Sequence, residues 1–167
     1  MPPDPKVVFD CNIFVQAFLS ASGPAASCVR LVESNVVTVL LSVEILAELR
    51  DVLNRPRLSR RFPAISQELV DEFLRRVLKN ADVVKEVGRH FNYERDPKDE
   101  KYINLALDGA ANYLISRDND LLDLMKETDD GKEFRQRFPS LTILNPVAFL
   151  RKVETLREDQ QHDAGGM

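Results

Sequence analysis

The sequence predicts an α/β fold, in which a parallel sheet of about five strands is covered by helices on both faces. Short apolar runs of strand length alternate with longer segments whose apolar residues recur every three or four positions. The length of 167 residues fits one domain with a sizeable core. We expect residues 1–153 to form this domain and the polar tail 154–167 to fray.

The predicted strands are the short apolar runs, and the first of them is the clearest. In chain order they cover Lys6–Phe9, 37–41, 82–85, 113–116 and 141–144. The third is the weakest candidate. Apolar strands joined by helical segments run parallel, so their carboxyl ends are expected at one edge of the sheet.

The predicted helices show apolar residues at helical spacing. They cover residues 11–20, 25–34, 43–54, 66–80, 98–110 and 121–125, and Pro146 opens a last one. Pro56 breaks the chain after the third. The most amphipathic is 66–80, with a stripe of Leu69, Val70, Phe73, Leu74 and Val77. This stripe is predicted to be ordinary core, with a groove for a second copy or a partner as the alternative.

The composition is that of a soluble globular protein, with 44% hydrophobic and 30% charged residues. No apolar run approaches the roughly 20 residues that span a bilayer, and the N-terminus does not resemble a signal peptide. Cys11 and Cys28 lie far apart and are expected to be reduced thiols, which favours a cytoplasmic protein. Two histidines, His90 and His162, exclude a histidine-rich zinc site.

The net charge of −4 counts against nucleic-acid binding by the whole surface, because phosphates attract lysine and arginine. It is compatible with a concentrated acidic site that binds a cation, beside separate basic strips. The charge alone does not decide between these functions.

Carboxylates follow two of the predicted strands. Asp10 comes directly after the first strand, and Asp118 and Asp120 follow the fourth. Ligands of parallel α/β sheets bind beyond the carboxyl ends of the strands, which makes these residues candidates for a site. The alternative is turn and cap chemistry, since Asp and Asn are good N-caps.

Asp99 lies on the apolar face of the predicted helix 98–110. The stripe of that helix consists of Tyr102, Ile103, Ala106, Leu107 and Ala110. A buried carboxylate costs several kcal/mol unless it is paired, so its position indicates a function. The alternative is a capping box, with Asp96 as the N-cap and Asp99 as the reciprocal acid. Capping and function can coexist.

Glu48 lies close to the buried stripe of the predicted helix 43–54. Glu44 and Asp51 turn further towards solvent, where they can pair with Arg50 or Arg55. The alternative for Glu48 is a solvated residue at the edge of the helix. Its candidacy rests on the other three acids.

Four acids at one edge of a sheet repel one another unless a cation intervenes. Carboxylate oxygens suit a hard ion such as Mg²⁺ or Mn²⁺. Such an ion serves phosphodiester hydrolysis. A glycosidase is less well matched, because it needs only two carboxylates and keeps one of them protonated.

These residues resemble the PIN domain. The matching segments are Val-Val-Phe-Asp10-Cys-Asn12, Ser42 followed by Glu48-Leu49, Asp96-Pro-Lys-Asp99-Glu, and Leu-Ile-Ser116-Arg-Asp118-Asn-Asp120. The resemblance covers about residues 6–150. It is strongest to the branch related to VapC toxins of toxin–antitoxin systems, of which the stretch 44–57 is typical. The ordered set is specific, although no single motif is.

The resemblance implies a three-layer α/β/α sandwich and an Mg²⁺- or Mn²⁺-dependent endoribonuclease. Its acidic quartet carries over as Asp10, Glu48, Asp99 and Asp118, and the supporting positions as Asn12, Ser116 and Asp120. Asp10, Asp99 and Asp118 would hold the metal, and Glu48 would bind it or orient the attacking water. The resemblance also implies a small antitoxin protein that covers the acidic site, and a possible homodimer.

Arginines and lysines near these acids are candidates for RNA binding, because arginine pairs with phosphate in a bidentate manner. They are Arg55 and Arg57 in the basic stretch 55–61, and Arg95, Lys98 and Arg117 beside the proposed ligands. A solvated basic strip is the alternative.

The main rival function is a PIN fold that serves as a non-catalytic RNA-binding or scaffold module. A haloacid-dehalogenase-like phosphatase is disfavoured, because it needs a second aspartate where this chain has Asn12. A receiver domain would need a phosphorylatable aspartate and a late lysine that the chain does not convincingly offer.

Overall fold

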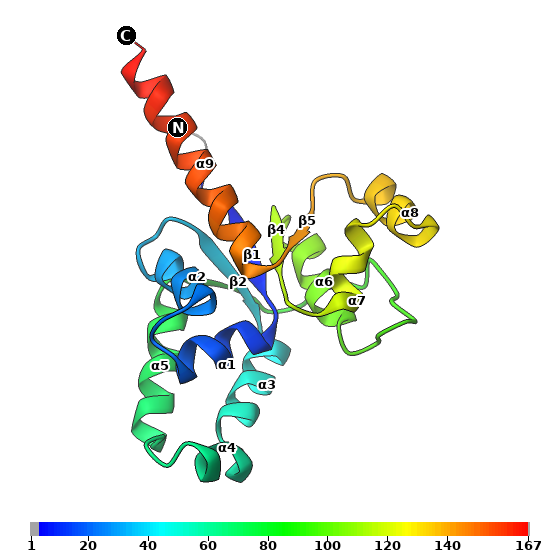
Figure 1. Cartoon of the computed structure of the whole chain (residues 1–167). Helices are drawn as coiled ribbons and strands as arrows, with labels where there is room; N and C mark the ends of the chain where they lie inside the picture. The colour runs from blue at the N-terminus through cyan, green and yellow to red at the C-terminus, as the bar shows by residue number, and fades with distance from the viewer. Residues whose placement is uncertain (1–3, 167) are drawn as a thin grey trace.

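A five-stranded parallel sheet lies at the centre of the computed structural model, which describes residues 4–166 (Figure 1). The strands are β1 (Lys6–Phe9), β2 (Thr38–Ser42), β3 (Ala81–Val84), β4 (Tyr113–Ile115) and β5 (Thr142–Leu144). Their order across the sheet is β3-β2-β1-β4-β5. The predicted α/β class and parallel five-stranded sheet are confirmed.

The strand order reverses beside β1, and this positions the candidate site. The chain moves from β1 outwards through β2 to β3, then returns to add β4 on the other side of β1. Val7 pairs with Val39 of β2 and with Tyr113 of β4. The loops that leave β1 and β4 therefore diverge at a topological switch point, where open α/β sheets bind their ligands.

Helices cover both faces of this sheet. They are α1 (Cys11–Leu19), α2 (Pro24–Glu33), α3 (Val43–Leu53), α4 (Pro56–Arg61), α5 (Gln67–Lys79), α6 (Glu100–Asp108), α7 (Asn119–Leu122), the short η1 (Asp123–Met125), α8 (Asp129–Arg137) and α9 (Pro146–Gly165). Helix α6 packs against β1, β2 and β4 on one face. Helices α1, α2, α5 and α9 form a connected layer on the other face (Figure 1).

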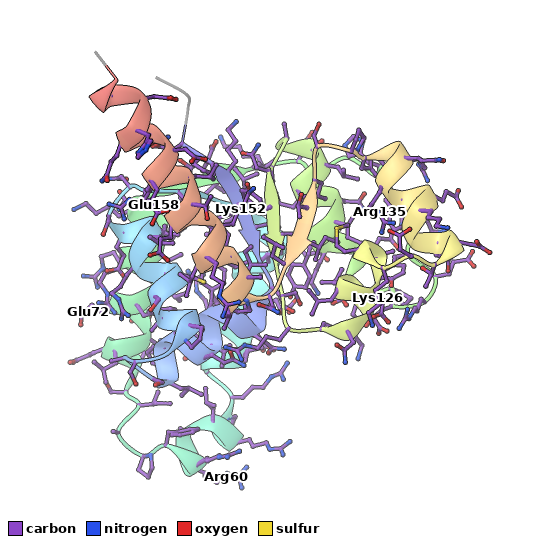
Figure 2. All side chains as sticks on the ribbon, turned by 45° about the horizontal axis from the view of Figure 1, so that its top comes forward. Arg60, Glu72, Lys126, Arg135, Lys152 and Glu158 are labelled. Carbon is purple, nitrogen blue, oxygen red and sulfur yellow. The ribbon has the colours of Figure 1, made fainter. Side chains whose placement is uncertain are left out.

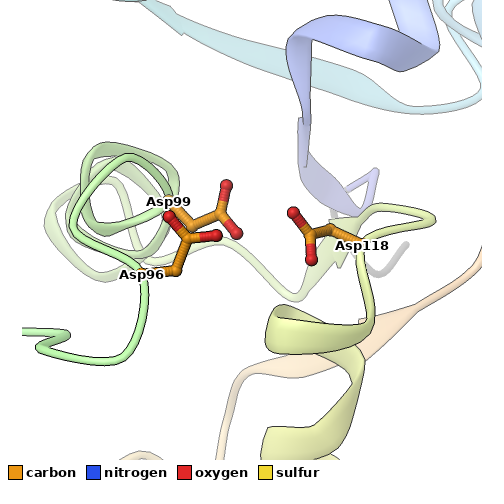
Figure 3. A group of neighbouring side chains, drawn as sticks. All are labelled: Asp96, Asp99 and Asp118. Atoms are coloured by element: carbon orange, nitrogen blue, oxygen red, sulfur yellow. The ribbon is translucent and has the colours of Figure 1, made fainter.

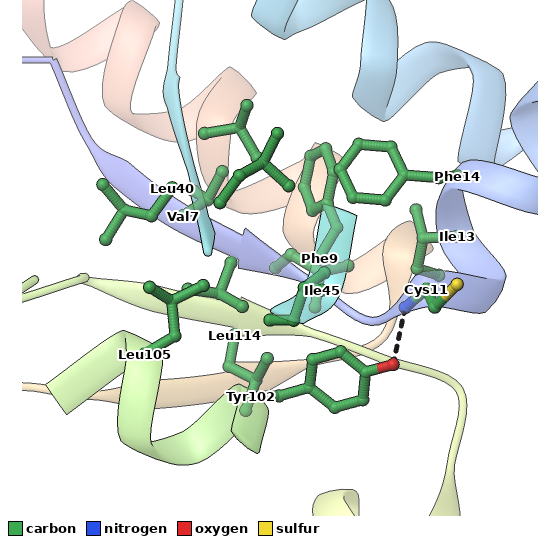
Figure 4. Packing of buried hydrophobic residues seen from close by; sticks show 14 of the residues in the cluster. Val7, Phe9, Cys11, Ile13, Phe14, Leu40, Ile45, Tyr102, Leu105 and Leu114 are labelled. Carbon is green, nitrogen blue, oxygen red and sulfur yellow. Dashed lines mark hydrogen bonds between the residues drawn. The ribbon is translucent and has the colours of Figure 1, made fainter. Parts of the chain in front are cut away.

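The core is apolar on both sides of β1, whose valines and Phe9 are fully buried. Phe9 packs edge-on against Phe14 of α1 and Phe149 of α9, with ring centroids 5.4 and 6.3 Å apart. On the opposite face, the hydroxyl of Tyr102 accepts a hydrogen bond from the backbone N–H of Cys11 at 3.2 Å (Figure 4). This contact fixes α6 against the carboxyl end of β1.

Two helices were not expected from the sequence. Helix α4 begins at Pro56, a residue suited to the first turn of a helix, but it buries no side chain and so shows no apolar period. Helix α8 buries only Gly131 and Phe134. It is started instead by Thr128, whose hydroxyl accepts a hydrogen bond from the N–H of Gly131 at 3.1 Å. Local signals, a proline in the first turn of α4 and a threonine cap in front of α8, thus begin these helices without a continuous buried stripe.

Two surface predictions are qualified by the structure. Leu69 was assigned to the buried stripe of α5, but it is 47% exposed, because the neighbouring helices cover only the side that carries Val70, Phe73, Leu74 and Val77. Helix α9 continues into the expected tail as far as Gly165, with mostly exposed side chains beyond Val153. Fraying of this segment stays a prediction. Within residues 4–166, no helix combines the length and the apolar character that crossing a membrane requires.

Candidate metal centre

The ends of β1 and β4 are joined through Ser116. The hydroxyl of Ser116 donates a hydrogen bond to Oδ2 of Asp10 at 2.7 Å and accepts one from the N–H of Asp118 at 2.9 Å. Both Ser116 and Asp10 are buried. The other oxygen of Asp10 accepts a hydrogen bond from the N–H of Asn12 at 2.8 Å, and Asp118 likewise caps α7 through the N–H of Asp120. The cap chemistry expected for these two aspartates is therefore present.

Asp99 is not part of a capping box, in contrast to the alternative drawn from the sequence. Helix α6 begins at Glu100, and Asp99 in front of it makes no side-chain cap hydrogen bond in the described part of the chain. Asp96 accepts a hydrogen bond from the N–H of Lys98, and Glu100 accepts one from the N–H of Tyr93. The Asp99 carboxylate is thus available to face the carboxylates of Asp96 and Asp118.

Asp96, Asp99 and Asp118 form the aspartate group, in which one carboxylate oxygen from each residue lies within 4.8 Å of the others. Their carboxylates point towards one another, two from the segment before α6 and one from the segment before α7 (Figure 3). Oδ2 of Asp99 is buried and has no hydrogen-bond partner among residues 4–166. A buried, unpaired carboxylate oxygen facing two other carboxylates calls for a cation or a proton.

The electrostatics of the aspartate group agree with this geometry. Burial, followed by the negative charges of Asp118 and Asp96, raises the pKa of Asp99 to about 8. Burial also raises the pKa of Asp10, although its hydrogen bonds from Ser116 and from the N–H of Asn12 oppose the shift. Both shifts have burial as their first cause and neighbouring acids as a further one, and a divalent ion bound to the carboxylates would oppose both.

Glu48 lies beside this group but has other partners. Its Oε1 accepts a hydrogen bond from the Tyr102 hydroxyl at 2.8 Å, and its Oε2 forms an ion pair with Lys101. Glu48 is half-buried, which agrees with its place close to the buried stripe of α3. The same Tyr102 hydroxyl accepts a hydrogen bond from the N–H of Cys11, so Glu48 lies close to the carboxyl end of β1.

The other residues predicted for the site have exposed side chains or form ion pairs with acids. Arg95 pairs with Asp120 and with Asp123, each at 2.8 Å, so its guanidinium is occupied by two acids. The side chains of Asn12, Lys98 and Arg117 are exposed, and so are those of Arg55 and Arg57. Arg55 pairs with Asp51 at 3.2 Å, as the sequence suggested. Helix α4 carries its arginines outwards at the edge of the molecule, as Arg60 shows (Figure 2).

Sequence reasoning missed two members of the site. It treated Asp96 only as a cap, although the spacing Asp96-Pro-Lys-Asp99 could have suggested two acids on one turn before a helix. It did not single out Lys101 at all, because the partner of Lys101 is Glu48 on a different helix.

The donor set fits a hard divalent cation. Carboxylate oxygens from three or four acids are the ligands that Mg²⁺ and Mn²⁺ prefer, and the orphaned oxygen of Asp99 supplies one that nothing in residues 4–166 satisfies. The fold and the aspartate group thus define an α/β protein with a carboxylate cluster that could hold such an ion.

Comparisons with known proteins agree with this class. A family model described as PIN domain matches residues 6–120, more than half of the chain. The protein therefore belongs to the PIN-domain family.

Two individual proteins are similar to the chain. The uncharacterized protein MJ1680 of Methanocaldococcus jannaschii is 26% identical over 149 residues, covering 89% of this chain and 92% of that protein. A chain in the crystal structure of VapBC2 from Rickettsia felis, bound to a DNA fragment from its promoter, is 15% identical. That match covers 84% of this chain and 98% of the other, with a TM-score of 0.49.

Ser116→Ala is expected to destabilise the metal-free protein by about 2 kcal/mol, since it leaves a buried oxygen of Asp10 without its donor. The midpoint of thermal unfolding should fall by about 4–8 °C. Ser59→Ala is the matched control, because its exposed hydroxyl donates a hydrogen bond to the carbonyl of Pro56 and to no side chain that the structure describes, and it should leave the midpoint nearly unchanged. Equal midpoints for both variants would show that Ser116 does not hold the two strand ends together.

Proposed function

We propose that the protein is an Mg²⁺- or Mn²⁺-dependent endoribonuclease that cleaves single-stranded or structured RNA. The observation that carries the proposal is the buried carboxylate oxygen of Asp99, which has no hydrogen-bond partner in the part of the chain that the structure describes and which lies close to Asp96 and Asp118. Membership of the PIN-domain family supports it. The quartet of Asp10, Glu48, Asp99 and Asp118 forms the catalytic site.

The residues have distinct tasks in this proposal. Asp99, Asp118 and Asp10 hold the ion, with Asp96 as an additional acid beside them. Ser116 keeps Asp10 and the Asp118 loop in register through its two hydrogen bonds. A divalent ion at such a site neutralises charge on a phosphodiester and makes a water molecule more acidic, so that it can attack in line.

A cysteine nucleophile is not needed and is disfavoured at this site. Burial, with the charges of Glu48 and Asp10 as further causes, raises the pKa of Cys11 to about 12. The thiol is therefore protonated at neutral pH and a poor nucleophile. Cys11 is best explained as a small buried residue at the start of α1.

The proposal is tested by incubating the purified protein with a fluorogenic single-stranded RNA in Mn²⁺, in Mg²⁺ and in EDTA. We expect cleavage with either ion and none in EDTA. RNA binding without cleavage in any buffer would instead favour the non-catalytic RNA-binding module. Cleavage that persists in EDTA would contradict a metal-dependent mechanism.

We propose further that the protein acts as the toxin of a toxin–antitoxin pair in the cytoplasm, with a small antitoxin that covers the aspartate group. The support is the sequence resemblance of the stretch 44–57 to the VapC-related branch. Expression of the chain alone should arrest growth, and co-expression of the product of an adjacent small reading frame should restore it. Normal growth in both cases would favour an RNA-processing role. Light scattering on the purified protein tests the homodimer.

A further inference from the structure

Glu48 differs from the other acids of the quartet because the protein itself satisfies both of its carboxylate oxygens. One accepts the hydrogen bond from Tyr102, and the other pairs with the Lys101 ammonium. The side chains of Lys101 and Glu48 are only 21% and 29% exposed, so the pair is largely shielded from solvent. Asp99, in contrast, has an oxygen without a partner among the described residues.

Lys101 is held in place by more than its ion pair. It lies on the first turn of α6, and its ammonium sits 5.2 Å from the centroid of the Tyr102 ring. Tyr102 is in turn anchored by the N–H of Cys11, directly after Asp10. Lys101, Tyr102 and Glu48 thus contact one another, and together they hold a positive charge at the edge of the acidic site.

Lys101 also lines a cavity of about 460 Å³, whose wall includes Lys98 and Glu100, the residues on either side of Asp99 in the chain. Lys98 and Arg89 line this cavity, together with Glu44 and Glu100. The carboxylate of Glu100 is turned to the N–H of Tyr93. The wall carries three cations against two acids, and this excess of positive charge suits the phosphates of a nucleic-acid strand.

We infer that Lys101 contacts a phosphate of the RNA where the strand passes from the aspartate group into this cavity, and that Glu48 positions Lys101 and does not bind the metal. The inference rests on the proposed ribonuclease function and assigns the substrate contact of the same site. Lysine is suited to this task because its ammonium has three N–H donors, so Lys101 can keep its ion pair with Glu48 and donate to a phosphate at the same time.

The inference is tested by the salt dependence of RNA binding. The wild type, Lys101→Met, Lys101→Arg, Glu48→Gln and the double variant Lys101→Met/Glu48→Gln are titrated with fluorescein-labelled single-stranded RNA in EDTA. Binding is followed by anisotropy at several salt concentrations. Lys152→Met is the control, because Lys152 is an exposed lysine on α9 (Figure 2). Calorimetric titration with Mn²⁺ in the absence of RNA measures ion binding separately.

Loss of one phosphate contact should lower the RNA affinity of Lys101→Met about tenfold. It should also reduce the slope of log affinity against log salt by about 0.7, the value for one phosphate on a single strand. Lys101→Arg should keep the wild-type slope. Glu48→Gln should weaken RNA binding without changing Mn²⁺ affinity, and the double variant should be no worse than Lys101→Met.

Either of two results would overturn the inference. One is a wild-type salt slope for folded Lys101→Met. The other is a Glu48→Gln variant that loses Mn²⁺ affinity, which would make Glu48 a metal ligand. If the wild type cleaves RNA and Lys101→Met binds RNA with the wild-type affinity and salt slope, the inference fails and the proposed function stands. If the wild type binds RNA through Lys101 and never cleaves it, the proposed function fails and the contact stands.

Discussion

Asp99→Asn is expected to lower the rate of metal-dependent RNA cleavage by about a thousandfold, the loss typical of a group that acts on reacting charge. The substitution removes the charge from a buried carboxylate whose Oδ2 has no hydrogen-bond partner within residues 4–166. Its shape is retained, and because Asp99 makes no side-chain cap bond, the start of α6 should be unaffected. Single-turnover cleavage with saturating enzyme measures the rate.

Asp51→Asn is the matched control for this experiment. Asp51 is an exposed aspartate near the C-terminal end of α3, the helix that also carries Glu48. Its carboxylate pairs with Arg55. Its replacement should leave cleavage at the wild-type rate. Cleavage by Asp99→Asn at the same rate as Asp51→Asn would assign the activity to a contaminant or to another site.

The second large effect concerns stability in metal-free buffer. In the folded protein the pKa of Asp99 is about 8, whereas in the unfolded chain it returns to about 3.8. Between these values the folded state holds a proton that the unfolded state has released, so stability falls as pH rises from about 4 to about 8. Asp99→Asn removes this titration. We therefore expect the variant to be more stable than the wild type at pH 8, by about 2 kcal/mol after solvent screening.

Adding Mn²⁺ at pH 8 should reverse this order. An ion that binds only the folded state stabilises it by about 2.7 kcal/mol at a hundredfold excess over its dissociation constant. The wild type should gain about 5–11 °C in its unfolding midpoint, and Asp99→Asn much less. Thermal unfolding with and without the ion across pH 4–8 checks both expectations. A wild-type midpoint that rises with pH in EDTA, or one that ignores Mn²⁺, would contradict the aspartate group as a metal site.

The sequence predicted the central sheet well because each strand is short, apolar and buried. Lys6–Phe9 was predicted with the bounds that the structure has, since its valines and Phe9 face the core on both sides of the sheet. The edge strand β3 was the weakest prediction, and two of its four residues are exposed. Helix α4 escaped prediction, because periodicity reports burial and this helix buries nothing.

The site was predictable to the extent that it depends on strand ends and helical faces. Asp10 and Asp118 follow β1 and β4, and Asp99 is buried as its helical spacing indicated. The pairing of Lys101 with Glu48 joins two helices 53 residues apart along the chain, and no local pattern encodes such a contact. Asp96 was hidden for a different reason: the sequence favours it as a helix cap, whereas in the structure it accepts a hydrogen bond from the N–H of Lys98 and joins the aspartate group.

The most direct test of the aspartate group is diffraction from crystals soaked in Mn²⁺, recorded where the ion scatters anomalously. The proposed function predicts an anomalous peak within bonding distance of carboxylate oxygens of Asp99 and Asp118. It predicts no such peak in crystals of Asp99→Asn treated in the same way. A peak only at other carboxylates, or none in the wild type at saturating Mn²⁺, would contradict the assignment of these aspartates as the metal site.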